Sequence, residues 1–261
     1  MAKQIGTRLV RFAGVPREEI VASHYRPEQA AMFHRATGIP VLTDNSEATA
    51  NSDIVVLCVR PQQARQVLAP LRPFLADGQR TLISIAVGPR VATLAKWVRS
   101  TGVIHLHPTS LLMATEHHNP GVSLWVAHPD IDPTTEKRMR RLFAAALGDL
   151  WTVPETQLPK YIFITGNCPA FLLRALEAFV AAARLPAHRA IGLEATILKS
   201  LHAGVGIEGR SPGQIIRRIA TPGGVTEAGL KVLEGKCQIE LQAREVYRAC
   251  KQRLRELSRA V

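Results

Sequence analysis

The stretch Ile54-Val55-Val56-Leu57-Cys58-Val59 decides the fold class of this chain. Every position in it is apolar, and β-branched side chains dominate. A strand with one solvated face alternates apolar and polar residues, so an unbroken apolar run indicates a strand buried on both faces of a parallel sheet. Residues 81–86, Thr-Leu-Ile-Ser-Ile-Ala, repeat this pattern after a helical segment over 62–75. The sequence therefore predicts an α/β domain with a parallel sheet.

Working outward from this stretch, the same alternation of strand and helix extends over the first 150 residues or so. Further strands are predicted at 20–23, 41–42, 103–107, 122–126 and 150–153, and further helices at 1–12, 27–37, 90–98 and 134–147. After Pro154 the periodicity is helical only, over 169–183, 186–204, 212–219, 226–234 and 238–258. We therefore expect a Rossmann-like doubly wound sheet in residues 1–153 and an all-α domain in residues 154–261.

Composition narrows the classes of partner. The net charge is +12, which allows a nucleic-acid surface, but the 33 Lys and Arg residues are spread along the chain and aromatic residues make up only 5%. Base-stacking platforms need aromatic side chains, so we expect no nucleic-acid partner. No apolar stretch approaches the roughly 20 residues of a membrane span, and the first residues lack the apolar core of a signal peptide. The expectation is a cytoplasmic protein without a membrane partner.

Three segments in this order resemble the pyrroline-5-carboxylate reductase family. They are residues 52–62, which contain Val59-Arg60-Pro61, residues 164–171, Ile-Thr-Gly-Asn-Cys-Pro-Ala-Phe, and residues 220–230, Ala-Thr-Pro-Gly-Gly-Val-Thr-Glu-Ala-Gly-Leu. The resemblance spans nearly the whole chain. It implies an NADPH-dependent reductase that converts a cyclic imine, 1-pyrroline-5-carboxylate, to proline, and a helical domain through which subunits form a homodimer or a larger homo-oligomer.

The beginning of the sequence departs from the expected pattern. A dinucleotide fold needs a first strand and a Gly-rich turn, so that backbone N–H groups reach the pyrophosphate at a helix N-terminus. Residues 1–9, Met-Ala-Lys-Gln-Ile-Gly-Thr-Arg-Leu, resemble the family motif Gly-x-Gly-x-Met-Ala only from its methionine onward. We therefore expect the sheet to lack its first strand, about ten residues in all with the glycines, and neighbouring strand edges to be exposed.

The resemblance also implies a set of cofactor-binding residues. The hydroxyl of Ser23 and the basic group of Arg26, at and after the end of the strand predicted at 20–23, favour NADP, whereas an acidic residue there would favour NAD. The other predicted members follow the family's cofactor loops. The full set is Met1, Ala2, Ser23, Arg26, Asn45, Val59, Arg60, Pro61, Ala86, Gly88 and Pro108. The alternative interpretation of Arg26 is a solvated arginine before a helix.

The reaction centre is predicted in the glycine-rich segment. Thr226 matches the family threonine that hydrogen-bonds the imine nitrogen, and a hydroxyl can both donate and accept a proton. Thr221, Gly223, Gly224 and Val225 would hold the substrate, because glycines allow the backbone to approach a ligand closely. The alternative is that Pro-Gly-Gly is only a turn and that Thr226 is a helix N-cap.

One segment differs from the family. Where the family carries Arg-x-Met-Pro-Asn-Thr, residues 105–110 read His-Leu-His-Pro-Thr-Ser. An altered substrate, or a catalytically silent paralogue with a regulatory or competence-type role, is therefore an alternative function. His105, His107, His117 and His118 also suggest a metal site, but only Glu116 lies at a supporting spacing, and we expect no metal.

Overall fold

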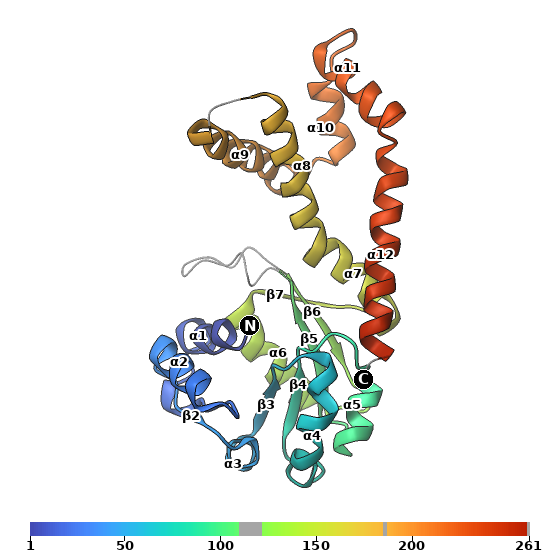
Figure 1. Cartoon of the computed structure of the whole chain (residues 1–261). Coiled ribbons are helices and arrows are strands. Elements are labelled where there is room, and N and C mark those ends of the chain that lie inside the picture. The colour runs from blue at the N-terminus through green and yellow to red at the C-terminus, as the bar shows by residue number, and fades with distance from the viewer. Residues whose placement is uncertain (110–121, 185–186, 260–261) are drawn as a thin grey trace. The chain divides into compact units, whose positions relative to one another are not determined.

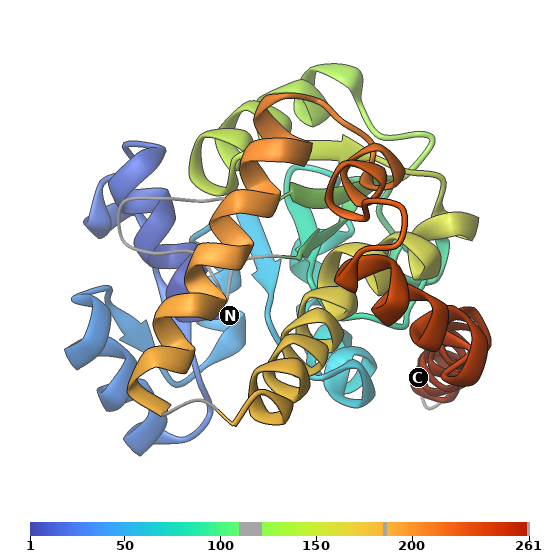
Figure 2. The same ribbon diagram turned by 90° about the horizontal axis from the view of Figure 1, so that it is seen from above.

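The computed structural model describes residues 1–109, 122–184 and 187–259. They form two compact units: residues 1–166 together with 251–261, and residues 167–250. Ser110, Glu116, His117 and His118 lie outside the described residues. Each unit is described separately below (Figures 1 and 2).

Seven strands of the first unit form two separate sheets. The larger sheet has the order β3 (Ile54–Leu57), β4 (Thr81–Ser84), β5 (Val103–Pro108), β6 (Val122–Ala127) and β7 (Asp149–Thr152). The smaller sheet pairs β1 (Ala22–Ser23) with β2 (Val41–Leu42) in parallel. The described strands follow the order of a Rossmann-like sheet that is divided between β1 and β3.

The larger sheet is mixed, which corrects the expectation of a purely parallel one. β3, β4 and β5 are parallel, β6 runs antiparallel to β5, and β7 is parallel to β6. The apolar pattern of residues 122–126 indicates burial on both faces and contains no information about strand direction. The direction of β6 is set by its pairing with β5 in the folded structure.

The helices of the first unit begin and end at recognisable signals. They are α1 (Ala2–Phe12), η1 (Arg17–Glu19), α2 (Pro27–Thr37), α3 (Asn45–Ala50), α4 (Pro61–Leu75), α5 (Val91–Val98), α6 (Pro133–Leu147), η3 (Glu155–Gln157), α7 (Leu158–Ile162) and η4 (Phe163–Asn167). Asp44 and Asp132 cap α3 and α6, because their side chains accept hydrogen bonds from backbone N–H groups of the first turn. Gly38 ends α2 in the left-handed conformation, with φ of 68°.

Helices cover both faces of the larger sheet and bury two apolar layers. On one face, α4, α5 and α7 pack on the sheet; this layer contains Leu68, Leu75, Leu82, Leu94, Val98, Val103 and Leu124. On the other face lie α1 and α6; this layer contains Ile5, Leu9, Ile83, Ile104, Leu106, Trp125, Met139 and Phe143. Each fully buried large side chain stabilises the fold by about 1.5–3 kcal/mol. Both faces are covered, as the apolar run at 54–59 predicted.

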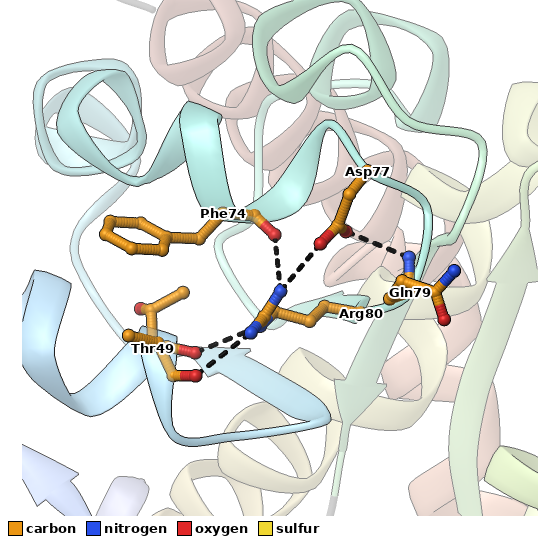
Figure 3. A network of polar contacts seen from close by, with 6 residues as sticks. Thr49, Phe74, Asp77, Gln79 and Arg80 are labelled. Atoms are coloured by element: carbon orange, nitrogen blue, oxygen red, sulfur yellow. Dashed lines mark hydrogen bonds and ion pairs between the residues drawn. The ribbon is translucent and has the colours of Figure 1, made fainter.

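Arg80 makes hydrogen bonds to the ends of two helices, α3 and α4, beside the first residue of β4 (Figure 3). Its guanidinium donates to the carbonyl oxygens of Thr49 at 3.2 Å, Ala50 at 2.9 Å and Phe74 at 3.0 Å, and pairs with Asp77 at 2.8 Å. These carbonyls belong to the last turns of α3 and α4, where carbonyl oxygens have no hydrogen-bond donor within the same helix. Arg80 therefore performs a structural role at the edge opposite to the carboxyl ends of the strands.

The second unit is helical throughout its described residues. It contains α8 (Cys168–Ala182), α9 (Ala187–His202), η5 (Ala203–Ile207), α10 (Pro212–Ile219), α11 (Val225–Lys231), η6 (Val232–Lys236) and the first part of α12 (Ile239–Arg259). None of its described residues is buried, and large apolar side chains such as Leu172 and Phe179 are 67% and 61% exposed. The unit thus lacks a core of its own, which is unusual for a folded domain.

The division between the units differs from the predicted boundary at residue 154. Residues 155–166 belong to the first unit, because Leu158 and Ile162 are buried in the layer formed with α4 and α5. The end of α12 from Lys251 onward also belongs to the first unit. The point in the sequence after which only helical patterns occur shows where the last strand ends. It does not show which unit each later helix packs against.

Candidate active site

A cavity of about 1640 Å³ opens beside β1 and β3 in the first unit. Five of the predicted cofactor-binding residues line it: Ala2, Ser23, Asn45, Val59 and Arg60. They come from α1, the end of β1, the start of α3 and the segment after β3. Ser23 Oγ donates to Asn45 Oδ1 at 2.7 Å, so these two side chains form one polar surface. Ligands of open α/β sheets bind at the carboxyl ends of the strands, which is where these residues meet.

Aromatic and basic groups border the same end of β1. His24 and Tyr25 line the cavity, and their rings stack with centroids 5.1 Å apart. The Arg26 guanidinium lies over the Tyr25 ring at 5.3 Å from its centroid. Arg26 itself does not line the cavity. It follows Ser23 by three residues and contacts Tyr25, which does line the cavity, and an arginine is a suitable partner for a phosphate group.

The start of α1 offers backbone donors to an anion. Met1 is the N-cap residue and its side chain makes no capping hydrogen bond, and the first turn contains no acidic residue. The first N–H groups of a helix have no partners within it, and with the helix dipole they attract negative charge. Ala2 and Lys3 line the cavity, and Met1 does not. The residues present therefore fit the phosphates of a dinucleotide, although the sequence contains no Gly-rich turn before this helix.

The remaining predicted cofactor residues follow the ends of β3, β4 and β5. Pro61 is the first residue of α4, Ala86 and Gly88 follow β4, and Pro108 ends β5. Gly88 has φ of 142°, and a Cβ placed there would lie 3.2 Å from the Leu257 carbonyl oxygen. A side chain at position 88 would therefore meet backbone that cannot swing aside. Sequence reasoning did not anticipate Leu257, because it is 169 residues away along the chain.

Two histidines occupy the centre of the sheet on β5. His105 is 1% exposed, and no described residue makes a hydrogen bond to either of its ring nitrogens. The rings of His105 and His107 stack with centroids 6.5 Å apart. Burial, and then the neighbouring His107, lowers the pKa of His105 to about 3, and burial lowers the pKa of His107 to about 4. Both rings are therefore neutral near pH 7. Within the described residues no group of three potential ligands surrounds a metal position.

The glycine-rich segment lies in the second unit and forms a tight turn before α11. Gly223 has φ of 72°, and a Cβ on Gly224 would lie 2.5 Å from Thr221 Oγ1, so both positions require glycine. The Gly224 N–H donates to the Thr221 carbonyl at 2.9 Å. Val225, 92% exposed, and Thr226 then open the helix, whose N-cap is Gly224. The alternative interpretation of Thr226 as the N-cap is therefore wrong.

Glu227 is a member of this turn that sequence reasoning missed. The Gly223 N–H donates to Glu227 Oε2 at 2.7 Å, and Glu227 also pairs with Lys231 at 3.5 Å. A carboxylate of the chain itself thus occupies a backbone donor of the segment that we expected to hold the substrate. The signal was available, because a glutamate in the first turn of a helix commonly accepts hydrogen bonds from preceding backbone N–H groups.

Comparison with known proteins divides the chain close to the boundary that the sequence predicted, near residue 154. Residues 1–88 match the family described as NADP oxidoreductase, coenzyme F420-dependent. Residues 155–257 match the family described as pyrroline-5-carboxylate reductase dimerisation. The pyrroline-5-carboxylate reductase of Pseudomonas aeruginosa is 28% identical over 95% of this chain and 90% of its own length. Over nearly its whole length, this chain is therefore similar to pyrroline-5-carboxylate reductases.

Further relatives extend the agreement to sequence and fold over most of the chain. The pyrroline-5-carboxylate reductase of Pisum sativum is 28% identical over 90% of this chain and 84% of its own length. A pyrroline-5-carboxylate reductase structure from Coxiella burnetii superposes with a TM-score of 0.80 at 26% identity, covering 98% of this chain and 95% of that one. The Plasmodium falciparum pyrroline carboxylate reductase, solved with NADP bound, shares the fold at a TM-score of 0.78 and 20% identity, covering 97% of this chain and 93% of that one. The family is one of NAD(P)-dependent oxidoreductases that act on a C=N bond.

Proposed function

We propose that this protein reduces a cyclic imine bearing a carboxylate, 1-pyrroline-5-carboxylate, to proline with NADPH. One observation carries the proposal: the cavity beside β1 and β3 gathers Ala2, Ser23, Asn45, Val59 and Arg60 in a chain whose relatives are reductases of this substrate. When bound, the reduced nicotinamide supplies a hydride to the imine carbon. The protein must orient the imine, exclude water and deliver one proton to the nitrogen.

Thr226 is proposed to deliver that proton. Its hydroxyl follows a turn in which Gly223 and Gly224 carry no side chains, so a substrate can approach the backbone closely. A hydroxyl donates to the imine nitrogen and is reprotonated from solvent or a neighbouring group. We further propose that the substrate carboxylate replaces Glu227 at the Gly223 N–H, because both groups are carboxylates and that N–H is already oriented to donate to one.

The variants Thr226→Ala and Thr226→Ser test this assignment in NADPH oxidation with 1-pyrroline-5-carboxylate. General acid catalysis contributes about 10²–10⁴-fold, so the alanine variant should lose about that much in kcat while serine retains most of it. Thr101→Ala removes a hydroxyl from an exposed loop residue of the first unit and serves as the matched control. Full activity in Thr226→Ala would refute the role of Thr226, and no turnover by the unmodified protein with any cyclic imine would refute the proposed function.

NADP is proposed over NAD because Ser23 and Arg26 place a hydroxyl and a cation at the end of β1. A ribose 2′-phosphate is stabilised there, whereas the ribose hydroxyls of NAD pair best with a carboxylate. Replacing Ser23 by Asp and Arg26 by Ala together should invert the ratio of KM values for NADPH and NADH. An unchanged ratio in the double variant would contradict the assignment.

A second candidate is a reductase of a different small imine, or a silent paralogue with a regulatory role. The specific observation in its favour is the pair His105 and His107, which replaces the family's Arg-x-Met on β5. Turnover measured with a panel of cyclic imines separates the three functions. The proposed reductase turns over pyrroline-5-carboxylate, a reductase with a different substrate turns over only another imine, and a silent paralogue turns over none.

The second unit is proposed to form a homodimer or larger homo-oligomer. Its described residues include no buried side chain, and residues 155–257 match a dimerisation domain.

The helical stretch Glu155–Ala182 is long and apolar enough to cross a membrane by length and composition alone, which is weak evidence for a span. We assign its apolar surface to the subunit interface and the protein to the cytoplasm. Light scattering on purified protein without detergent checks this, and a soluble monomer would contradict it.

A further inference from the structure

The last turns of α12 meet two loops of the first unit that we predicted to hold the cofactor. A Cβ on Gly88, in the segment after β4, would lie 3.2 Å from the Leu257 carbonyl oxygen and 3.5 Å from Pro61 Cβ at the start of α4. In Figure 1 the last turns of α12 lie beside the segment that joins β4 to α5. Three segments far apart in the sequence therefore come together at the carboxyl ends of β3 and β4, where ligands of open α/β sheets bind.

The absence of a side chain at Gly88 permits this close approach. The segment after β4 presents bare backbone to α12, so the α12 backbone can come within van der Waals distance of it. The beginning of the same segment is fixed, because Ala86 is only 2% exposed. The conformation of its end at Gly88 is therefore set by the two groups that contact it, Pro61 and the last turns of α12.

Two leucines provide the apolar contact of this part of α12. Leu254 and Leu257 are half-buried, whereas the other side chains from 251 to 258 are exposed. Residues three apart lie on the same face of a helix, so both leucines face the first unit, to which these turns belong. A contact with so few buried apolar groups opens readily in solution. A ligand that binds only when the loops are held in place therefore stabilises the closed contact.

We propose that Leu254 and Leu257 are positioning residues for NADPH, an inference that rests on the proposed function. By holding the last turns of α12 against Gly88 and Pro61, they fix the two loops in the conformation that binds the cofactor. Neither leucine takes part in hydride transfer. Because a coupling free energy acts equally in both directions, docking of these turns strengthens NADPH binding, and NADPH strengthens their docking by the same factor.

The first test is titration of the full chain with NADPH in the absence of substrate. In the double variant Leu254→Ala/Leu257→Ala the fraction of protein with ordered loops falls, so we expect the Kd for NADPH to rise on the order of tenfold. The double methionine variant keeps the apolar contact and should keep the wild-type Kd. Arg255→Ala, which changes an exposed side chain between the two leucines, is the matched control. At saturating NADPH, kcat of the double alanine variant should equal that of the wild type, which a general loss of folding would not allow.

The second test measures the opposite direction of the coupling in the unmodified protein, so it does not depend on the folding of any variant. NADPH should slow amide hydrogen exchange at Leu254 and Leu257 on the order of tenfold, the same factor as in the titration. The amides of α8, in the second unit, are the internal reference.

Three outcomes would overturn the inference. They are a wild-type Kd in the folded double alanine variant, an equal rise in Kd in Arg255→Ala, and unchanged exchange at Leu254 and Leu257 when NADPH is bound. Failure of the unmodified protein to bind NADPH at all would instead refute the proposed function. The two failures are therefore distinguishable in the same titration.

Discussion

His105 makes the stability of this protein unusually sensitive to mild acid. Its ring is 1% exposed, and neither nitrogen has a hydrogen-bond partner among the described residues. Burial, and then His107, lowers the pKa of His105 to about 3, whereas a histidine in an unfolded chain titrates near 6.5. The folded state therefore binds fewer protons than the unfolded state below pH 6.5, so unfolding becomes easier as the pH falls.

The magnitude follows from the difference between the two pKa values. Below pH 6.5 each buried neutral histidine lowers the free energy of unfolding by about 1.4 kcal/mol per pH unit until its folded pKa is reached. At pH 5 that is about 2 kcal/mol from His105 and a similar amount from His107, whose pKa is lowered to about 4. Together they amount to about 4 kcal/mol, which is between about a quarter and four fifths of the 5–15 kcal/mol by which native proteins are stable.

The variant His105→Leu removes one of these two contributions. We expect its free energy of unfolding, measured in urea between pH 7 and pH 5, to fall with about half of the wild-type slope. At pH 7 we expect little loss, because an apolar side chain of similar size replaces an unpaired polar ring. Equal slopes for His105→Leu and wild type would refute the reasoning, since they would mean that the ring is solvated or paired.

Three further predictions concern backbone and capping contacts of the first unit. Gly88→Ala should lower the free energy of unfolding by about 1–3 kcal/mol and weaken NADPH binding in titration calorimetry, because φ of 142° is unfavourable and the new Cβ meets the Leu257 carbonyl; unchanged stability would contradict this. Arg80→Lys should cost about 1–3 kcal/mol in thermal unfolding, since a single ammonium cannot serve the carbonyls at the ends of α3 and α4; a wild-type Tm would argue against it. Asp132→Ala should lower the Tm through loss of the α6 cap, and Asp132→Asn should retain most of the wild-type Tm; equal loss in both variants would exclude capping as the cause.

Much of the fold was accessible from local sequence patterns. The apolar run at 54–59 indicated a strand covered on both faces, and α4 and α6 do cover the sheet from opposite sides. Turn and cap residues such as Gly38 delimited the helices close to their observed ends. The direction of β6 was not accessible, because burial is the same for parallel and antiparallel neighbours. The burial pattern and the helix ends depend on residues within one segment, so local reasoning succeeded there, whereas the direction of β6 depends on its pairing with β5.

The candidate site, like the fold, could be predicted only in part from the sequence. The sequence by itself predicted the residue types: Ser23, Asn45 and Arg60 for a cofactor, and Thr226 after two glycines for a reaction centre. Only the tertiary structure brought Ser23, Asn45 and Arg60 to one cavity and placed Gly88 against the Leu257 carbonyl. The physical reason is that a residue's chemistry is carried by its own side chain, whereas a shared cavity or a contact between distant residues exists only once distant segments have packed.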